Sequence, residues 1–192
     1  MGLAPLISSF SIVALAEFGD KTQLAAITLA TRGRPLPVFS GAMLAVLLVD
    51  GLSVLVGGAL AEVLPTKWMG VGSGLVFIFF GIYTLLHRDG GEVEIVGRKS
   101  SLATSFSLIA LMELGDKTQF ASIALAARYG SPALVIVGIA LAYLLTMGTG
   151  VLLGSGLLKL LPASYLRICS SAIFILFGIS FLFSAVAGMA SF

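Results

Sequence analysis

Long apolar stretches separated by short polar breaks dominate this chain. Six stretches reach the length of about 20 residues that a helix needs to cross a bilayer. They cover residues 4–31, 38–61, 68–87, 102–127, 132–158 and 164–188. The breaks contain typical loop residues, such as Arg32-Gly33-Arg34-Pro35 and Tyr129-Gly130-Ser131-Pro132. The pattern predicts an all-α integral membrane protein with six transmembrane helices.

Composition supports lipid as the solvent. Of the 192 residues, 58% are hydrophobic and 10% are charged, whereas about 25% of a soluble domain is charged. The net charge of +2 and the lack of a basic run argue against a nucleic-acid partner. The single cysteine, Cys169, excludes an internal disulfide and a cysteine-rich metal site. The first stretch has no basic start and runs straight into Glu17, so we expect a mature span rather than a cleaved signal.

Lysine and arginine in the loops predict the orientation in the membrane. One side has seven of them, Arg32, Arg34, Arg88, Arg98, Lys99, Lys159 and Arg167, and the other side has two, Lys67 and Arg128. This asymmetry places the loop between the halves in the cytoplasm and both termini outside it. We therefore expect a multi-pass protein of the cell (inner) membrane.

The chain contains an internal duplication. Residues 17–32 and 113–128 are identical at eleven of sixteen positions, at an offset of 96. Residues 41–83 then align with 138–180 without gaps, at an offset of 97. The predicted organisation is repeat 1 (1–87), a cytoplasmic loop (88–101) and repeat 2 (102–192). Because each repeat has three spans, the second must enter the membrane from the opposite side, as in many secondary transporters. A structural membrane scaffold is the alternative.

The strongest match between the copies is a charged motif inside the first and fourth spans. Glu17 and Asp20 in the first copy correspond to Glu113 and Asp116 in the second. Each pair has i,i+3 spacing and therefore shares one helix face. Charges at this depth cost several kcal/mol each and usually mark an ion or proton pathway. We expect the four carboxylates to converge on one cavity between the repeats.

Further oxygen donors lie in the same two segments. Gln23 and Gln119 continue the i,i+3 spacing with amide oxygens, and both are candidate metal ligands. Thr22 and Thr118 add hydroxyl oxygens if the helix unwinds locally. Gly19 and Gly115 favour such unwinding, because glycine tolerates backbone conformations that other residues resist.

The donor types indicate a hard cation. Carboxylate, carbonyl and water oxygens suit Ca²⁺, Mn²⁺ and Mg²⁺. His87 lies at a span end and Cys169 near the start of the sixth span, which argues against a Zn²⁺ or Cu⁺ site. Donor type alone does not separate Mn²⁺ from Ca²⁺. The ion is expected as transported substrate, and no cofactor is expected.

Charge suggests how transport is driven. Four carboxylates and the two motif lysines, Lys21 and Lys117, leave a net charge of −2, which one divalent cation neutralises. An empty site with that charge is costly in the membrane interior, and proton uptake would relieve the cost. The hypothesis is metal–proton exchange, with the lysines pairing with the emptied carboxylates. The alternative is that lysine–carboxylate bridges only lock the two helices together.

The doubled Glu-x-Gly-Asp-Lys-Thr motif resembles the signature of a cation antiporter family. This family includes Golgi-type manganese/calcium–proton exchangers, chloroplast manganese transporters and bacterial manganese exporters. The resemblance covers the whole chain, with a motif in spans one and four and a polar loop between the halves. It implies exchange of Mn²⁺ or Ca²⁺ for protons, with Glu17, Asp20, Glu113 and Asp116 as the cation site. The compact length resembles a prokaryotic member and implies manganese efflux.

Asp50 breaks the internal symmetry, because its repeat partner is Met147. It is a candidate proton carrier or extra ligand, or else a polar residue bonded to a neighbouring helix. Other function classes remain open. An exporter of small amino acids or other organic solutes is the main alternative, but a site with excess negative charge suits a carboxylate substrate poorly. A passive channel and a membrane enzyme are further alternatives. The expectation is a transporter and not an enzyme, and the oligomeric state is not predicted.

Overall fold

The computed structural model describes residues 2–86, 101–153 and 163–187. His87, residues 88–100 of the predicted loop, and residues 154–158 and 188 of two predicted spans lie outside these ranges. The described helices are α1 (Ala4–Glu17), α2 (Lys21–Thr31), α3 (Pro35–Val63), α4 (Thr66–Leu86), α5 (Leu102–Glu113), α6 (Lys117–Tyr129), α7 (Pro132–Leu153) and α9 (Ala163–Ala187). The expectation of an all-α chain is confirmed for this part of it.

Four of the described helices are long and apolar enough to cross a membrane, and they match four of the predicted spans. They are Pro35–Val63, Thr66–Leu86, Pro132–Leu152 and Arg167–Ala187. Proline sets several of their limits. Pro35 and Pro132 occupy the first helical position, where the missing N–H costs nothing, and α3 ends before Leu64-Pro65.

The other two predicted spans differ from continuous helices. The stretch 4–31 forms α1 and α2, and the stretch 102–127 forms α5 and α6. Each stretch that was predicted as one span is therefore divided into two helices, with breaks at residues 18–20 and 114–116. The local unwinding that the motif glycines favoured is present in both copies.

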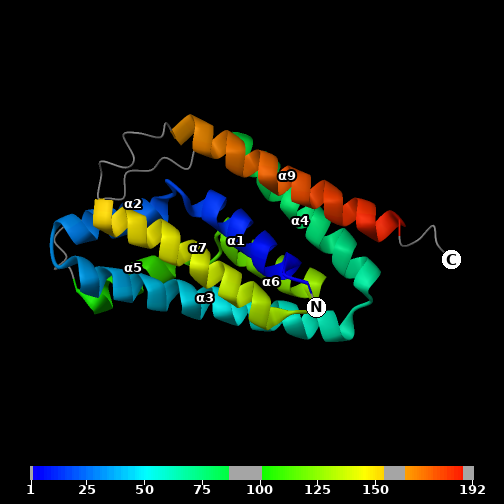
Figure 1. Cartoon of the computed structure of the whole chain (residues 1–192), viewed down its shortest axis with the longest axis horizontal. Coiled ribbons are helices and arrows are strands. Elements are labelled where there is room, and N and C mark those ends of the chain that lie inside the picture. Colours follow the sequence, from blue (N-terminus) through cyan, green and yellow to red (C-terminus); the bar gives the residue numbers. More distant parts are fainter. Residues whose placement is uncertain (1, 87–100, 154–162, 188–192) are drawn as a thin grey trace.

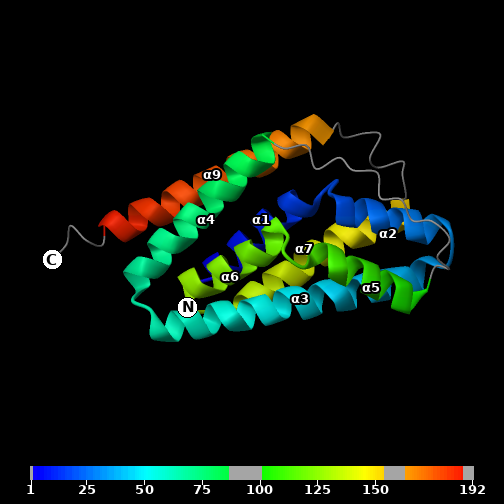
Figure 2. The ribbon, with the colours of Figure 1, turned by 180° about the vertical axis from the view of Figure 1, so that it is seen from behind.

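The helices form an elongated bundle in which α4 and α9 lie side by side along one side of the others (Figure 1). The turn between α2 and α3 lies at one end of the bundle. The N-terminus and the turn between α3 and α4 lie at the other end, as the view from behind also shows (Figure 2). The breaks after α1 and α5 therefore fall between the two ends.

Glycines at equivalent positions of the two repeats make equivalent close contacts. A Cβ at Gly41 of α3 would collide with the carbonyl oxygen of Leu102 in α5, and one at Gly138 of α7 would lie against that of Leu6 in α1 (2.5 Å). Gly41 and Gly138 occupy equivalent positions in the two copies, as do Leu6 and Leu102. Small residues let membrane helices approach closely. The two copies therefore use the same close contact to position the helices that lead to the motif.

Helices α4 and α9 also contact each other through glycines at equivalent positions of the two repeats. A Cβ at Gly81 would lie 3.0 Å from the carbonyl oxygen of Ser171, and one at Gly178 would lie 2.8 Å from that of Gly74. Gly81 is equivalent to Gly178, and Gly74 to Ser171. Helices α4 and α9 thus pack through small residues, which let membrane helices approach closely.

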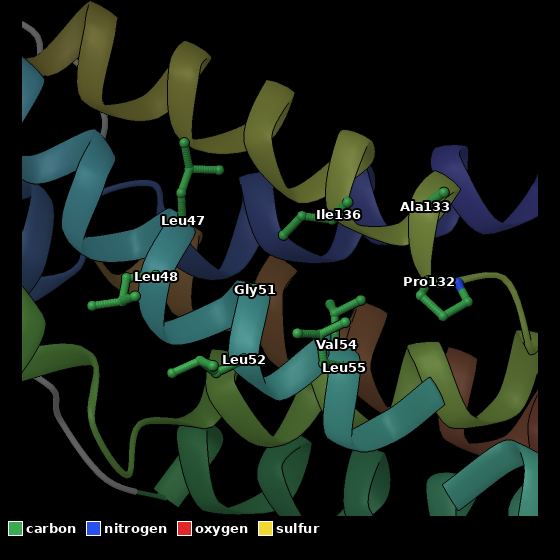
Figure 3. Close-up of a pocket in the computed structure, with 9 residues that line it drawn as sticks. All are labelled: Leu47, Leu48, Gly51, Leu52, Val54, Leu55, Pro132, Ala133 and Ile136. Atoms are coloured by element: carbon green, nitrogen blue, oxygen red, sulfur yellow. The ribbon is translucent and has the colours of Figure 1, made fainter. Parts of the chain in front are cut away.

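The outer surface of the bundle is apolar. Leu55, Phe79 and Phe183 are among many large apolar side chains that are more than half exposed. A groove between α3 and α7 is lined by Leu47, Leu48, Gly51, Leu52, Val54, Leu55, Pro132, Ala133 and Ile136 (Figure 3). None of these lining residues is titratable, so the groove is separate from the charged motif. Such a surface suits contact with lipid chains rather than water.

Candidate cation site

The two motif copies adopt the same broken-helix geometry. Helix α1 ends at Glu17 and α2 begins at Lys21, with Gly19 between them at φ 77°. Helix α5 ends at Glu113 and α6 begins at Lys117, with Gly115 at φ 79°. Only glycine populates this left-handed region without a steric penalty. The motif glycine therefore allows the chain to leave one helix and start another inside the bundle.

A glutamine side chain closes each break. The backbone N–H of Gly19 donates to Gln23 Oε1 at 2.7 Å, and that of Gly115 donates to Gln119 Oε1 at 2.7 Å. Gln23 also donates its amide hydrogen to the carbonyl oxygen of Thr146 at 2.5 Å. The two predicted amide ligands thus satisfy N–H groups that the broken helices leave open. Each amide oxygen has two lone pairs, so one remains for a further partner.

Three of the four motif carboxylates come together. Oxygen atoms of Glu17, Asp20 and Asp116 all lie within 4.8 Å of one another. Glu17 is fully buried, and neither of its carboxylate oxygens has a hydrogen-bond partner among the described residues. Because buried polar oxygens are normally satisfied, two open oxygens on a buried carboxylate indicate a place for a cation or a proton. The cluster includes residues of both halves, as the sequence predicts.

Each motif lysine pairs with the aspartate of the other copy. Lys21 Nζ lies 2.9 Å from Asp116 Oδ1, and Lys117 Nζ lies 2.8 Å from Asp20 Oδ1. The pairs differ in exposure, because the Lys117 side chain is 6% exposed and the Lys21 side chain 35%. The reciprocal bridges connect the two breaks and hold the aspartates near Glu17.

Glu113 has different neighbours from its repeat partner Glu17. The Tyr143 hydroxyl donates to Glu113 Oε2 at 2.9 Å, and the Thr118 hydroxyl donates to the same oxygen at 3.2 Å. Thr22 is fully buried in the same region and interacts with Glu113. Glu113 thus has one oxygen without a hydrogen-bond partner among the described residues, whereas Glu17 has two.

Asp50 is 1% exposed in the middle of α3. The Ser122 hydroxyl of α6 donates to its Oδ1 atom at 2.7 Å. Sequence reasoning missed Ser122 and Tyr143. A signal for both was present, because each is polar at a position where the other copy has an apolar residue, Ala26 or Val46.

The electrostatics of the site favour a small hard cation. Helices α2 and α6 begin at the motif and direct their positive ends toward the carboxylates. Helices α1 and α5 end there with terminal carbonyl groups, and such groups coordinate cations where broken helices line an ion site. The donor set consists of oxygen atoms, and four carboxylates with two lysines give a net charge of −2. This chemistry matches a divalent ion bound by oxygen ligands.

Comparison with known proteins agrees with this chemistry. The family described as "Divalent cation/proton antiporter GDT1" matches residues 5–92 and 101–189. No solved structure matches the chain.

Similarity to individual proteins extends over most of the chain. A "Putative manganese exporter" of Vibrio cholerae is 33% identical over 183 residues, covering 93% of this chain and 90% of that protein. The chloroplastic protein PAM71 of Arabidopsis thaliana is 30% identical over 162 residues, or 68% of this chain and 44% of that protein. GDT1-like protein 5 of Oryza sativa is 39% identical over 87 residues, or 45% of this chain and 38% of that protein. The family match spans both halves, so this chain belongs to the GDT1 family of divalent cation/proton antiporters and is a transporter rather than an enzyme.

Proposed function

We propose that this chain exports Mn²⁺ from the cell in exchange for protons, at a single site shared by its two repeats. The observation that carries the proposal is the cluster of Glu17, Asp20 and Asp116, whose carboxylate oxygens lie within 4.8 Å of one another. A cluster of this kind at the interface of two repeats is where secondary transporters bind their ions. The antiporter family supplies the reaction class.

Mn²⁺ is the proposed substrate, and Ca²⁺ is the alternative. Both ions accept oxygen ligands, so the ligands alone do not decide between them. The similarity to a Vibrio cholerae protein named as a putative manganese exporter favours Mn²⁺ and the outward direction.

In this proposal Glu17, Asp20 and Asp116 bind the ion directly. Glu113 completes the set when the Tyr143 hydroxyl turns away from it. The amide oxygens of Gln23 and Gln119 and the hydroxyls of Thr22 and Thr118 are further donors next to these carboxylates.

Exchange follows from the charge of the site. One divalent ion neutralises the net charge of −2, and two protons do the same. When the ion leaves, Lys21 and Lys117 keep the aspartates paired, and protons neutralise the glutamates. The site is therefore neutral whether it holds the metal ion or two protons. It can open to either side of the membrane without moving uncompensated charge, which is costly in the membrane interior.

The proposed architecture is six spans in two inverted three-span repeats, with each motif span broken at its glycine. Equivalent contacts in the two copies support this arrangement, because Gly41 packs on Leu102 as Gly138 does on Leu6, and Gly81 packs on Ser171 as Gly178 does on Gly74. The excess of lysine and arginine in the loops on one side supports a cell-membrane orientation with both termini outside the cytoplasm.

The test is flux into liposomes that contain the purified chain. We expect an imposed pH gradient, acidic inside, to drive accumulation of Mn²⁺ as protons leave. Ca²⁺ should move more slowly under the same gradient. Movement of neither ion would contradict the proposal and favour an organic-solute exporter. Mn²⁺ movement that is indifferent to the pH gradient would contradict proton coupling and favour a passive channel.

A further inference from the structure

We propose that Asp50 binds the exchanged proton, on a polar branch that is separate from the metal-binding cluster. The branch consists of Asp50 on α3, Ser122 on α6 and Tyr143 on α7, and we call it the asymmetric branch. The inference rests on the proposed metal–proton exchange and identifies Asp50 as the residue that takes up a proton before it reaches the motif glutamates.

The asymmetric branch is continuous and buried. Ser122 Oγ lies 2.7 Å from Asp50 Oδ1. The Tyr143 hydroxyl interacts with Asp50 and lies 2.9 Å from Glu113 Oε2. All three side chains of the branch are at most 1% exposed. Tyr143 thus connects Asp50 to a carboxylate of the motif.

The repeat equivalents of all three branch residues are apolar. Asp50, Ser122 and Tyr143 correspond to Met147, Ala26 and Val46, and each of these is fully buried. The other copy therefore packs the same positions without any polar group. Buried polar groups are costly unless they are satisfied, so packing alone gives no reason for three of them to occur together in one place.

The motif is duplicated and the asymmetric branch is not, which indicates that the metal ion and the proton bind to different residues. The carboxylates of the motif are duplicated in both copies, as expected for a metal that is bound from two sides. The asymmetric branch occurs once. A proton needs only one carboxylate oxygen, so a single unduplicated acid suffices to bind it.

Asp50 also lies outside the group of carboxylates that gather closely. That group contains Glu17, Asp20 and Asp116. Ser122 holds one oxygen of Asp50, while the other oxygen is buried with no hydrogen-bond partner among the described residues. This open oxygen is a place for a proton.

A tyrosine hydroxyl is suited to connect two carboxyl groups, because it donates one hydrogen bond and accepts others. When Asp50 is protonated, rotation of its carboxyl group would let its O–H donate to the Tyr143 oxygen, while the tyrosine hydroxyl still donates to Glu113. If both protons shift along these bonds, Asp50 loses a proton, Glu113 gains one and Tyr143 is unchanged. The branch therefore carries a proton between Asp50 and the motif without net change in the tyrosine.

The charged and titratable groups that face Asp50 come from three helices. Tyr143 lies on α7, Glu113 ends α5, and Asp116 precedes α6. Helix α2 also packs on α3, but its Lys21 is bound to Asp116. Lys117 of α6 is bound to Asp20. Both lysines thus form bridges to motif aspartates.

The test compares two flux assays on the full chain in liposomes. Exchange of labelled Mn²⁺ for unlabelled Mn²⁺ at equal pH requires the metal site but no net proton movement. Accumulation of Mn²⁺ driven by a pH gradient requires both. We expect Asp50→Asn to keep Mn²⁺–Mn²⁺ exchange near the wild-type rate and to reduce gradient-driven accumulation to the level seen without a gradient.

Tyr143→Phe provides a second variant that keeps the ring and its packing. Its hydroxyl also holds Glu113, so it should slow gradient-driven accumulation by a larger factor than Mn²⁺–Mn²⁺ exchange. This difference decides the question if Asp50→Asn does not fold. Tyr129→Phe is the matched control, because it removes a hydroxyl that is bonded to Ser8 at 2.9 Å, outside the branch. This control should behave as wild type in both assays.

Two results would overturn the inference while leaving the proposed function intact. One is gradient-driven accumulation that persists at the wild-type level in both branch variants. The other is loss of Mn²⁺–Mn²⁺ exchange in folded Asp50→Asn protein, which would make Asp50 part of the metal site. If the wild-type chain itself moves no Mn²⁺ in either assay, the proposed function fails and the inference fails with it.

Discussion

Glu17→Gln and Asp116→Asn should each abolish Mn²⁺ transport, although the two residues belong to different halves of the chain. Their carboxylate oxygens meet Asp20 within one cluster of 4.8 Å. Either amide substitution keeps the shape of the side chain and removes one negative charge. The site then has a net charge of −1 and no longer neutralises a divalent ion. Because the cluster needs donors from both repeats, neither half compensates for a loss in the other.

Flux into liposomes measures this directly, and both variants should fall to the rate of liposomes without protein. Glu62→Gln is the matched control, because Glu62 is an exposed carboxylate near the end of α3. Its transport should equal that of wild type. Retained flux in Asp116→Asn, with loss in Glu17→Gln alone, would mean that one repeat binds the ion by itself.

Lys117→Met should destabilise the protein much more than Lys21→Met. Lys117 is 6% exposed and its partner Asp20 is 3% exposed, whereas Lys21 is 35% exposed. Removing one partner of a buried ion pair costs about 3–5 kcal/mol, because the remaining charge is left buried. A pair in contact with solvent is worth about 0–1 kcal/mol. The two lysines have the same role by sequence, so the difference arises from their surroundings.

Thermal unfolding in detergent micelles tests this pair of variants, which are each other's control. Mn²⁺ should raise the midpoint of Lys117→Met more than that of wild type, because the bound ion replaces the missing positive charge next to Asp20. Equal midpoints for the two variants, with or without Mn²⁺, would mean that the bridges are equally solvated in the folded protein.

Much of the fold was predictable because lipid restricts the choice of structure. A spanning segment must satisfy its backbone groups internally, so apolar length alone indicated where helices form. The helices α3, α4, α7 and α9 begin and end within a few residues of their predicted limits in the described part of the chain. The breaks at Gly19 and Gly115 were also anticipated, because glycine in a charged intramembrane motif favours unwinding.

The side-chain partners at the site were less predictable, because they depend on how the helices rotate against one another. Spacing placed four carboxylates on facing segments, but it did not separate Glu113 from the other three. That separation depends on Tyr143, which lies 30 residues along the chain from Glu113. Spacing also gave no hint that Gln23 and Gln119 use their amide oxygens to close the helix breaks. These contacts are set by packing between helices, which a single sequence does not specify.

If both repeats build one metal site, a single Mn²⁺ should bind between them. Titration of the detergent-purified chain, followed by the electron paramagnetic resonance signal of free Mn²⁺, gives the number of bound ions and their affinity. We expect one tightly bound Mn²⁺ per chain, with affinity lowered by about tenfold or more in both Glu17→Gln and Asp116→Asn. Two equivalent ions per chain, or an affinity unchanged in either variant, would contradict it.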